Sequence, residues 1–393
     1  MKKNKILSLL MALVMVVLAG CGGQTGEKGG ESKGATEPSD VKVGIVCSAA
    51  GQNDTGYNKA IVDKATAMSK DKGFHLQVVE PTNGVPNAIE TLAEDGYQLI
   101  FSMEYDFEAL VNGVGGAAPL AEQYPDTTFV IFNDNPNVDE NGETKFKNVI
   151  SVLFDVNESS YLAGYLYVLV NEASAKLFGD GYKFVAPEEA RAAGFIGGTN
   201  SNGITVCSYA FIAGMNDAAA EKNVTYDYYA KYDAGFTDSA LGSTVAGTFF
   251  DNKANVVFAD AGIVGDGITS KAKEVGRLAI QVDANLDAQQ PGYVLTSVLK
   301  LTDAPGEAIL NSFLEGKIGE QENVQTFGIK SMATDITDLS EIAKVVQDQD
   351  AWKEIVDKVQ EKRQAIIDGS LKVINAQNGD TFDASAYPHV IVK

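Results

Sequence analysis

Histidine and cysteine are scarce in this 393-residue chain, which has two histidines and three cysteines. Zinc sites need Cys or His ligands at short, regular spacings, and no such cluster is present. With two histidines, the chain also has few candidates for the general base of a Ser/His/Asp catalytic set. A zinc protein and a hydrolase with a serine nucleophile are therefore both disfavoured, and we expect no metal ion and no cofactor.

Basic residues are few relative to acidic ones. The chain has 31 lysines and arginines against 53 aspartates and glutamates, which gives a formal net charge of −22. The first twenty residues contain three lysines and no acid, so their removal leaves −25. A surface of this sign repels phosphate backbones and anionic headgroups. The composition therefore argues against a nucleic-acid partner.

A long apolar run is also missing. The apolar run at residues 6–19 has 14 residues, too few for a comfortable bilayer crossing, and it follows Lys2, Lys3 and Lys5. This arrangement is typical of a signal peptide, which we assign to residues 1–20.

The end of this segment, Leu-Ala-Gly-Cys at 18–21, resembles the lipobox of bacterial lipoproteins, in which the cysteine is lipidated and becomes the first residue after cleavage. We expect lipidation of Cys21, with residues 21–40 as a flexible tether rich in Gly, Ser, Glu and Lys. The alternative is a plain secretory signal with a chance cysteine.

Two further cysteines remain, Cys47 and Cys207. They could form a disulfide, but a strand residue and a residue of a distant helix seldom meet at bonding geometry, so we expect buried free thiols.

From residue 41 onward, apolar strands alternate with amphipathic helices, the order that produces parallel sheets covered on both faces. Two such series of similar size predict an α/β protein of two lobes, joined by several crossovers and hinged around a cleft, as in type I periplasmic binding proteins. We assign residues 41–155 and 320–393 to lobe I and residues 156–319 to lobe II. Strands are expected at 41–46, 75–79, 98–102, 128–132, 148–154, 193–197, 225–230, 256–259, 278–282 and 293–298. Helices are expected from about 56 to 70 and at 87–94, 107–123, 158–174, 205–220, 238–251, 265–275, 303–314 and 351–368.

The stretch 41–60 is expected to form part of the site. Its apolar start is typical of a strand buried on both faces. Residues 48–51, Ser-Ala-Ala-Gly, form a small-residue loop that lets a ligand approach the backbone, and a polar residue among 53–55 can cap the next helix. Because open α/β sheets bind ligands at the carboxyl ends of strands, Tyr57 and Asn58 should face that crevice from the first helical turn.

Eight segments, in their order and spacing, resemble the basic membrane protein family of substrate-binding lipoproteins, which is similar to the purine-nucleoside receptors of ABC importers. The resemblance covers nearly all of the mature chain. It implies a monomer, lipid-anchored at the extracytoplasmic face of the cell membrane, that captures a nucleoside, expected to be a purine nucleoside, for an ABC permease and ATPase. The segments are GQNDTGYN (51–58), EDGYQLIF (94–101), NVISVLFDVNESSYLAGYL (148–166), GFIGG (194–198), AGFTD (234–238), ADAGIVGDG (259–267), VDANLD (282–287) and YVLTSVLK (293–300).

The chain departs from the family pattern at two places. The family usually has two adjacent acids followed by Lys-Ser-Phe-Asn, where this chain has Asn-Asp-Thr-Gly-Tyr-Asn at 53–58. It usually has a turn with Gly and Phe where this chain has Met-Glu-Tyr-Asp at 103–106. These departures leave the class of protein unaffected and bear on the identity of the ligand.

A nucleoside needs flat partners for its base and hydrogen-bonding partners for its sugar. Stacking on an aromatic ring contributes about 1–3 kcal/mol per base. Tyr57, Tyr105 and Phe236 each follow a strand end, and ordinary packing is the alternative for each. For the vicinal hydroxyls of ribose, Asp283 and Lys300 resemble the family's ribose clamp, with a turn cap and a solvated lysine as the alternatives.

The base edge and the backbone complete the expected site. Asp54 and Asn58 are the candidates for the base edge, and Asp54 is alternatively a helix cap. Gly262 lies in AGIVGDG, which resembles a phosphate-cradling loop, but no Lys-Ser/Thr follows it, so close backbone approach to the cleft is the better explanation. Three further acids rank below these residues: Asp134, Glu158 and Asp260.

Other functions fit the same fold. A nucleoside hydrolase or phosphorylase would need an aspartate cluster for calcium or a base with a tuned pKa. The sequence has no closely spaced Asp quartet, so we expect no enzyme activity. The remaining alternatives are a binding protein for a sugar or another small polar solute, and a sensor of the same fold that presents its closed form to a signalling receptor.

Overall fold

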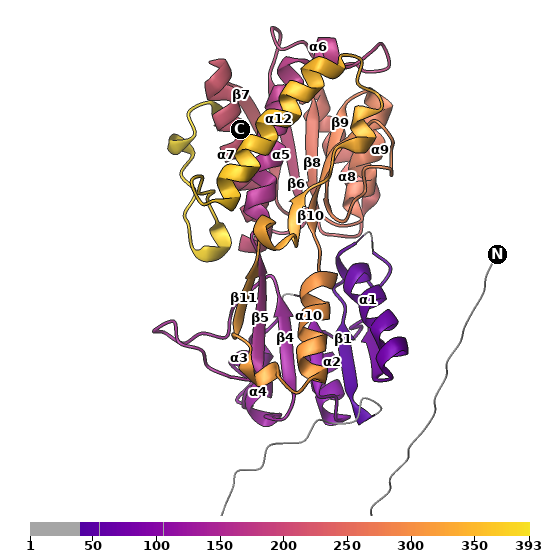
Figure 1. Cartoon of the computed structure of the whole chain (residues 1–393), viewed down its shortest axis with the longest axis vertical. Helices are drawn as coiled ribbons and strands as arrows, with labels where there is room; N and C mark the ends of the chain where they lie inside the picture. Colours follow the sequence, from indigo (N-terminus) through magenta and orange to yellow (C-terminus); the bar gives the residue numbers. More distant parts are fainter. Residues whose placement is uncertain (1–39, 55, 105) are drawn as a thin grey trace, which may run out of the picture. The chain divides into compact units, whose positions relative to one another are not determined.

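The computed structural model describes residues 40–54, 56–104 and 106–393. Two largely parallel sheets, each with helices packed on it, account for most of this part of the chain (Figure 1). The α/β class predicted from the alternation of strands and helices is confirmed. Within the described ranges, none of the helices combines the length and the apolar character that crossing a membrane requires.

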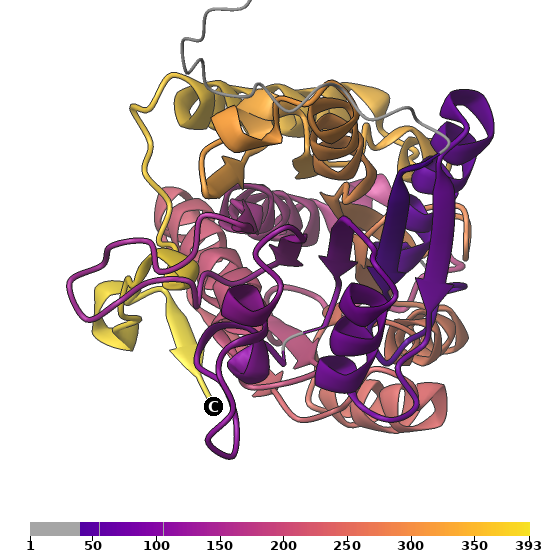
Figure 2. The ribbon, with the colours of Figure 1, turned by 90° about the horizontal axis from the view of Figure 1, so that it is seen from below.

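The first sheet has six parallel strands in the order β11-β5-β4-β3-β1-β2. Helices α1 (Tyr57–Lys72) and α10 (Asp303–Leu314) cover one face, and α2 (Val85–Glu94) covers the other (Figure 2). Covered faces explain why strand β1 is apolar on both sides. We call this sheet and its helices the first lobe. Its strands are β1 (Lys42–Val46), β2 (His75–Val79), β3 (Leu99–Ser102), β4 (Thr128–Phe132), β5 (Val149–Phe154) and β11 (Val324–Phe327).

The second sheet has seven strands in the order β12-β10-β9-β8-β6-β7-β13, of which β12 is antiparallel to its neighbour. Helices α5 (Val156–Glu172) and α7 (Asn202–Lys222) pack with one face, and α8 (Ser239–Asp251) and α9 (Val264–Val275) pack with the other. We call this sheet and its helices the second lobe. Its strands are β6 (Ala192–Gly197), β7 (Tyr226–Lys231), β8 (Val256–Asp260), β9 (Leu278–Asp283), β10 (Val294–Lys300), β12 (Thr334–Ile336) and β13 (Val390–Val392).

Helix α5 is the apolar helix that the sequence placed in the core, and nearly all of its side chains are buried. It crosses α7 at close range, because a Cβ on Gly164 would lie 2.1 Å from the carbonyl oxygen of Phe211. The remaining helices are short or lie near the C-terminus. They are α3 (Glu108–Val111), α4 (Leu120–Gln123), α6 (Ser174–Leu177), α11 (Ser340–Ala343), α12 (Gln349–Ile367) and the 3-10 turns η2 (Ile318–Glu320), η3 (Ile329–Ser331), η4 (Ala376–Asn378) and η5 (Ala384–Ala386).

The helix predicted at 107–123 is wrong. The structure has two four-residue helices there, α3 and α4, separated by a loop. Gly113, Gly115 and Gly116 in that loop all have positive φ, which a continuous right-handed helix does not allow. Apolar spacing alone predicted the helix, and the glycines override it.

The C-terminal part of the chain also differs from the expected lobe assignment. Of the segment 320–393, only β11 joins the first sheet, whereas β12 and β13 pair in the second. Conversely, α10, expected in lobe II, packs against α1 in the first lobe. Strands β12 and β13 have three residues each, too few for a hydrophobic period to specify a partner. In the described residues the chain passes between the sheets after β5, after β10 and after β11.

Candidate ligand-binding site

One cavity lies where the carboxyl ends of strands from the two sheets face each other. Residues that follow β1, β3 and β4 line it from the first lobe, and residues at the ends of β8, β9 and β10 line it from the second. In each sheet these three strands are neighbours. About 520 Å³ of space there, part of it open to solvent, is not filled by protein atoms. This is the position at which open α/β sheets bind ligands.

Asp54 and Asn58 fix the loop before α1. The Asp54 carboxylate accepts backbone N–H groups of the first helical turn, from Gly56 and Lys59 at Oδ1 (3.1 and 3.0 Å) and from Asn58 at Oδ2 (2.8 Å). Asp54 thus caps the helix, which was the alternative to its role at the base edge, and it also lines the cavity.

Asn58 is fully buried and does not line the cavity. Its Nδ2 donates to Ser48 Oγ (2.8 Å) and Asp54 Oδ2 (2.9 Å), and its Oδ1 accepts the Ser48 N–H (2.9 Å). The amide is therefore occupied by these contacts within the protein. The structure gives Asn58 a role in shaping the loop in place of the predicted contact with a base edge.

The ring of Tyr57 forms part of the first-lobe wall. Its hydroxyl donates to the carbonyl oxygen of Met103 (3.1 Å) and accepts from Asn133 Nδ2 (2.5 Å). Asn133 follows β4 in the left-handed region, with φ of 68°, and its buried Oδ1 has no hydrogen-bond partner among the described residues. The ring is thus held between the ends of β3 and β4. Sequence reasoning missed Asn133 and Met103, although Asn133 carried a signal as a polar residue directly after a buried strand.

Glu104 was also missed. It follows β3, and its Oε2 accepts the N–H of Ala49 at 2.9 Å, which fixes the small-residue loop against the strand ends. Ser48, Ala49 and Ala50 line the cavity, in keeping with the expected close backbone approach. Tyr105, expected to stack on a base, lies outside the described residues, as does Cys21. Their roles stay predictions.

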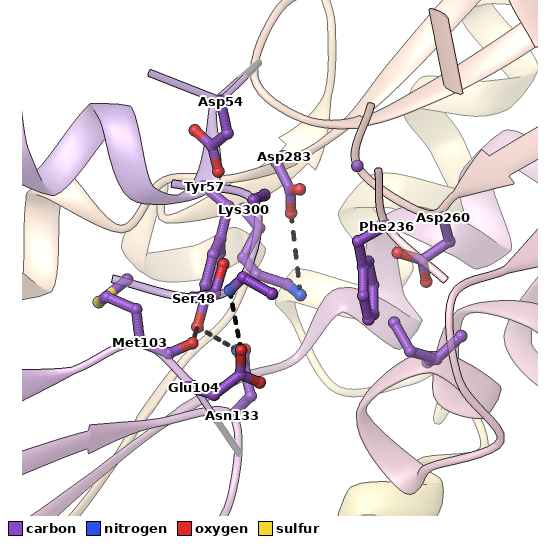
Figure 3. A pocket seen from close by; sticks show the side chains of 14 residues that line it. Ser48, Asp54, Tyr57, Met103, Glu104, Asn133, Phe236, Asp260, Asp283 and Lys300 are labelled. Carbon is purple, nitrogen blue, oxygen red and sulfur yellow. Dashed lines mark hydrogen bonds and ion pairs between the residues drawn. The ribbon is translucent and has the colours of Figure 1, made fainter. Parts of the chain in front are cut away.

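Asp283 and Lys300 end the neighbouring strands β9 and β10, with Lys300 Nζ 3.9 Å from Asp283 Oδ1 (Figure 3). The Lys300 side chain is 5% exposed, so it is not a solvated surface lysine. Its ammonium lies 5.6 Å from the ring centre of Tyr57, within cation–π range. Burial raises the pKa of Asp283 to about 7, the carboxylates of Asp260 and Asp54 act in the same direction, and Lys300 opposes them. The two predicted sugar ligands therefore line the cavity side by side.

Phe236 lies before α8, and Figure 3 shows it on the opposite side of the pocket from Tyr57. Gly198 lies directly against its ring, since a Cβ there would come within 2.2 Å of the ring carbon Cε1. The carbonyl oxygen of Phe236 accepts the N–H of Ile263 at 2.9 Å, next to Gly262 with its φ of 55°. Gly262 also lines the cavity, so its backbone reaches the cleft as expected.

The three lower-ranked acids separate in the structure. Asp260 lines the cavity at the end of β8. Asp134 lines an adjoining cavity beside the start of α7. Glu158 accepts the N–H of Ile329 at 2.8 Å, between the segments that pass from one sheet to the other, and lies outside the cavity lining. Ile204 of α7 adds an apolar contact to the lining that sequence reasoning did not identify.

The cavity is rich in hydrogen-bond acceptors. Its described lining has four carboxylates and a single ammonium, that of Lys300. In the described ranges no three His, Cys, Asp or Glu side chains gather in a way that could hold a metal ion. Cys47 and Cys207 are both free and buried, as predicted. Such a lining suits a ligand with a flat apolar part and several hydroxyl or amine donors. The lining carboxylates are Asp54, Glu104, Asp260 and Asp283.

Comparison with known proteins gives relatives along the whole chain. An "ABC transporter nucleoside-binding protein BmpA" of Lactococcus lactis subsp. cremoris is 26% identical over 397 residues, which cover 95% of this chain and 99% of that protein. A "CD4+ T-cell-stimulating antigen" of Listeria monocytogenes is 23% identical over 398 residues, with 94% and 99% covered.

The fold of this chain is also similar to that of solved structures. An ABC transporter solute-binding protein from Aeropyrum pernix K1 superposes with a TM-score of 0.71 over 88% of this chain and 95% of that one, at 19% identity. Residues 41–373 match the sequence profile of the Bmp family, described as PnrA-like substrate-binding proteins of ABC transporters. Because that profile spans most of the chain, the resemblance to basic membrane proteins is confirmed, and this protein belongs to the Bmp family of ABC transporter substrate-binding proteins.

Proposed function

We propose that this protein captures a nucleoside, expected to be a purine nucleoside, in the cavity between its lobes and delivers it to an ABC permease and ATPase. The observation that carries the proposal is the combination of an aromatic ring from each lobe with the buried Asp283–Lys300 pair in one cavity. The rings suit the two faces of a base, and the charged pair suits the hydroxyls of a sugar.

The base would lie between Tyr57 and Phe236. One ring comes from each lobe, so closure of the lobes would bring them to opposite faces of the same base. Each stacked ring would contribute about 1–3 kcal/mol. The Lys300 ammonium now lies over the Tyr57 ring, so binding would move it off that face toward the sugar.

The sugar would lie at the ends of β9 and β10. An ionised carboxylate at Asp283 accepts two hydrogen bonds from vicinal hydroxyls, and the ammonium of Lys300 donates one to a sugar oxygen. Both side chains are largely shielded from water, at 13% and 5% exposed, and a hydrogen bond to a charged group is worth more there than in solvent.

The charge of the lining favours a nucleoside over a nucleotide. Four carboxylates and one ammonium would repel a phosphate, and a buried anion without a cation is costly. The name of the Lactococcus relative, a nucleoside-binding protein, supports the same ligand class.

We further propose that Cys21 is lipidated after removal of residues 1–20, and that the tether to residue 40 holds the protein at the extracytoplasmic face of the cell membrane as a monomer. Residues 1–39 lie outside the described part, so this step is supported by the signal-peptide pattern of the sequence and by the family to which the chain belongs.

Mass spectrometry of the ligand that copurifies with the chain lacking residues 1–21 tests the proposal. We expect a nucleoside, released on denaturation and recovered unchanged after prolonged incubation. A sugar or another solute in its place would contradict the nucleoside assignment. Conversion of added nucleoside to free base would instead identify an enzyme.

A further inference from the structure

A second carboxylate lies beside the Asp283–Lys300 pair. Asp260 ends β8, the strand that pairs with β9, and it is 3% exposed. It lines the cavity, and Figure 3 shows its carboxylate beside the ring of Phe236. Neighbouring strands are about 4.8 Å apart, so the ends of β8 and β9 can contact the same small ligand.

The side chain of Asp260 is only partly satisfied within the protein. Its carboxyl is within hydrogen-bonding reach of the Cys207 thiol. Its Oδ2 is buried and has no hydrogen-bond partner among the described residues. Its backbone carbonyl, by contrast, accepts the N–H of Gly198 at 3.0 Å. A buried acceptor without a partner destabilises the protein that carries it, and one at the wall of a cavity can be satisfied by a ligand.

A second buried aspartate, Asp287, has a structural role that Asp260 lacks. Asp287 is also buried and also has an unpartnered Oδ2, yet its Oδ1 accepts the hydroxyl of Ser297 at 2.7 Å, and Ser297 Oγ in turn accepts the N–H of Leu286. Asp287 therefore holds a loop in place, outside the cavity lining. Asp260 makes no comparable bond to a backbone group or hydroxyl in the described residues.

We infer that Asp260 is a ligand-binding residue whose free oxygen accepts a hydrogen bond from the 5′-hydroxyl of a ribonucleoside. The inference rests on the proposed function, in which Asp283 holds the two vicinal hydroxyls of the ribose. The 5′-hydroxyl is then the one remaining donor of the sugar, and Asp260 is the acceptor at the adjacent strand end. A phosphate at the same position would meet a carboxylate, so Asp260 also selects against 5′-phosphorylated ligands.

Calorimetry with adenosine and 5′-deoxyadenosine tests this assignment on the wild type, Asp260→Asn and Asp260→Leu. The wild type should bind adenosine at least about tenfold more tightly than 5′-deoxyadenosine, because the deoxy analogue leaves the buried Oδ2 of Asp260 without a hydrogen-bond donor. Asp260→Leu should reduce that ratio to about threefold or less, mainly by weakening adenosine, and Asp260→Asn should give an intermediate ratio, since its amide oxygen still accepts.

Thermal unfolding of the ligand-free proteins separates a binding role from a structural one. Both Asp260 variants should unfold at a higher temperature than the wild type, because each removes a buried carboxylate whose Oδ2 has no hydrogen-bond partner among the described residues. The matched control Asp287→Asn should unfold at a lower temperature and bind adenosine as the wild type does.

Each remaining outcome overturns a defined claim. If the affinity ratio between adenosine and 5′-deoxyadenosine were the same in Asp260→Leu as in the wild type, this inference alone would be overturned. Equal losses of affinity for both ligands in Asp260→Leu would have the same consequence. Absence of adenosine binding by the wild type would overturn the proposed function and this inference with it.

Discussion

The ammonium of Lys300 lies between two partners, 3.9 Å from a carboxylate oxygen of Asp283 and 5.6 Å from the ring centre of Tyr57. The first partner belongs to the second lobe and the other to the first. One cation therefore bridges the groups that we assign to the sugar and to the base. A ligand that enters the cavity competes with the Tyr57 ring for this ammonium. It also gains the ammonium as a hydrogen-bond donor next to the Asp283 carboxylate.

Affinity for adenosine should rise about tenfold from pH 6 to pH 8. The pKa of Asp283 is raised to about 7 in the free protein. Sugar hydroxyls donate to the ionised carboxylate, so bound ligand lowers that pKa, and below pH 7 binding must first displace a proton. Calorimetry at pH 6, 7 and 8 checks this. Asp283→Asn should bind weakly with a flat pH profile, and a wild-type affinity that falls as the pH rises would contradict the role of Asp283.

Lys300→Gln should destabilise the ligand-free protein more at pH 8 than at pH 5.5. The raised pKa of Asp283 means that its protonated form favours the folded state, a contribution present at low pH and lost as the pH rises through about 7. Without the ammonium, the described lining of the cavity has no cation beside the ionised carboxylates of Asp283 and Asp260. Loss of a buried partner costs up to about 3–5 kcal/mol.

Thermal unfolding at the two pH values measures the difference. The control Lys64→Gln removes a more exposed pair with Glu307 (2.8 Å), so it should cost less than about 1 kcal/mol at either pH. If Lys300→Gln lowered the stability of the ligand-free protein equally at both pH values, the charge of Lys300 would not be the cause of the loss.

Gly198→Ala should weaken nucleoside binding although Gly198 is not part of the cavity lining. The new Cβ would lie 2.2 Å from Cε1 of Phe236, so the ring must move from its wall of the cavity. Loss of its stacking contact would weaken binding by up to about 3 kcal/mol. The control Gly247→Ala, whose Cβ would meet nothing closer than 3.9 Å, should bind normally. Normal affinity in Gly198→Ala would argue against stacking on Phe236.

Cys21→Ala should release the protein from the membrane or leave it unprocessed. Two acyl chains anchor a protein stably where a single chain is marginal, and the variant has no site for either. Membrane fractionation and the mass of the intact protein measure the outcome. Unchanged fractionation together with a processed mass that differs only by the Cys-to-Ala substitution would remove the lipoprotein assignment.

Most helices and strands with a regular apolar pattern were predictable from the sequence, and the glycine-interrupted segment 107–123 was an exception. The helix expected at 303–314 is α10 (Asp303–Leu314), and the strand expected at 256–259 is β8 (Val256–Asp260). Such elements carry several periods of hydrophobic pattern. The partners of β12 and β13 were not predictable, because three residues contain only about one and a half periods of the two-residue strand pattern. Their pairing is decided by distant parts of the chain.

The site shows the same limit at single residues. Residues after strand ends were recognised as candidates, and Tyr57, Phe236, Asp283 and Lys300 do meet in one cavity. Asn133 also follows a strand end but was not singled out, and its orientation depends on a backbone with φ of 68°, a conformation that the sequence does not specify. Asn58 was misjudged, because nothing in its own position reveals that Ser48 and Asp54 already occupy its amide.

Calorimetry of the chain lacking residues 1–21 with adenosine, guanosine, inosine and their free bases tests the central claim most directly. The wild type should bind the nucleosides more tightly than the bases, because only nucleosides reach Asp283 and Lys300. Asp283→Ala should weaken nucleosides far more than bases, since it leaves sugar hydroxyls unpaired in a closed site. No binding of any nucleoside by the wild type, or equal losses for nucleosides and bases in Asp283→Ala, would contradict the nucleoside assignment.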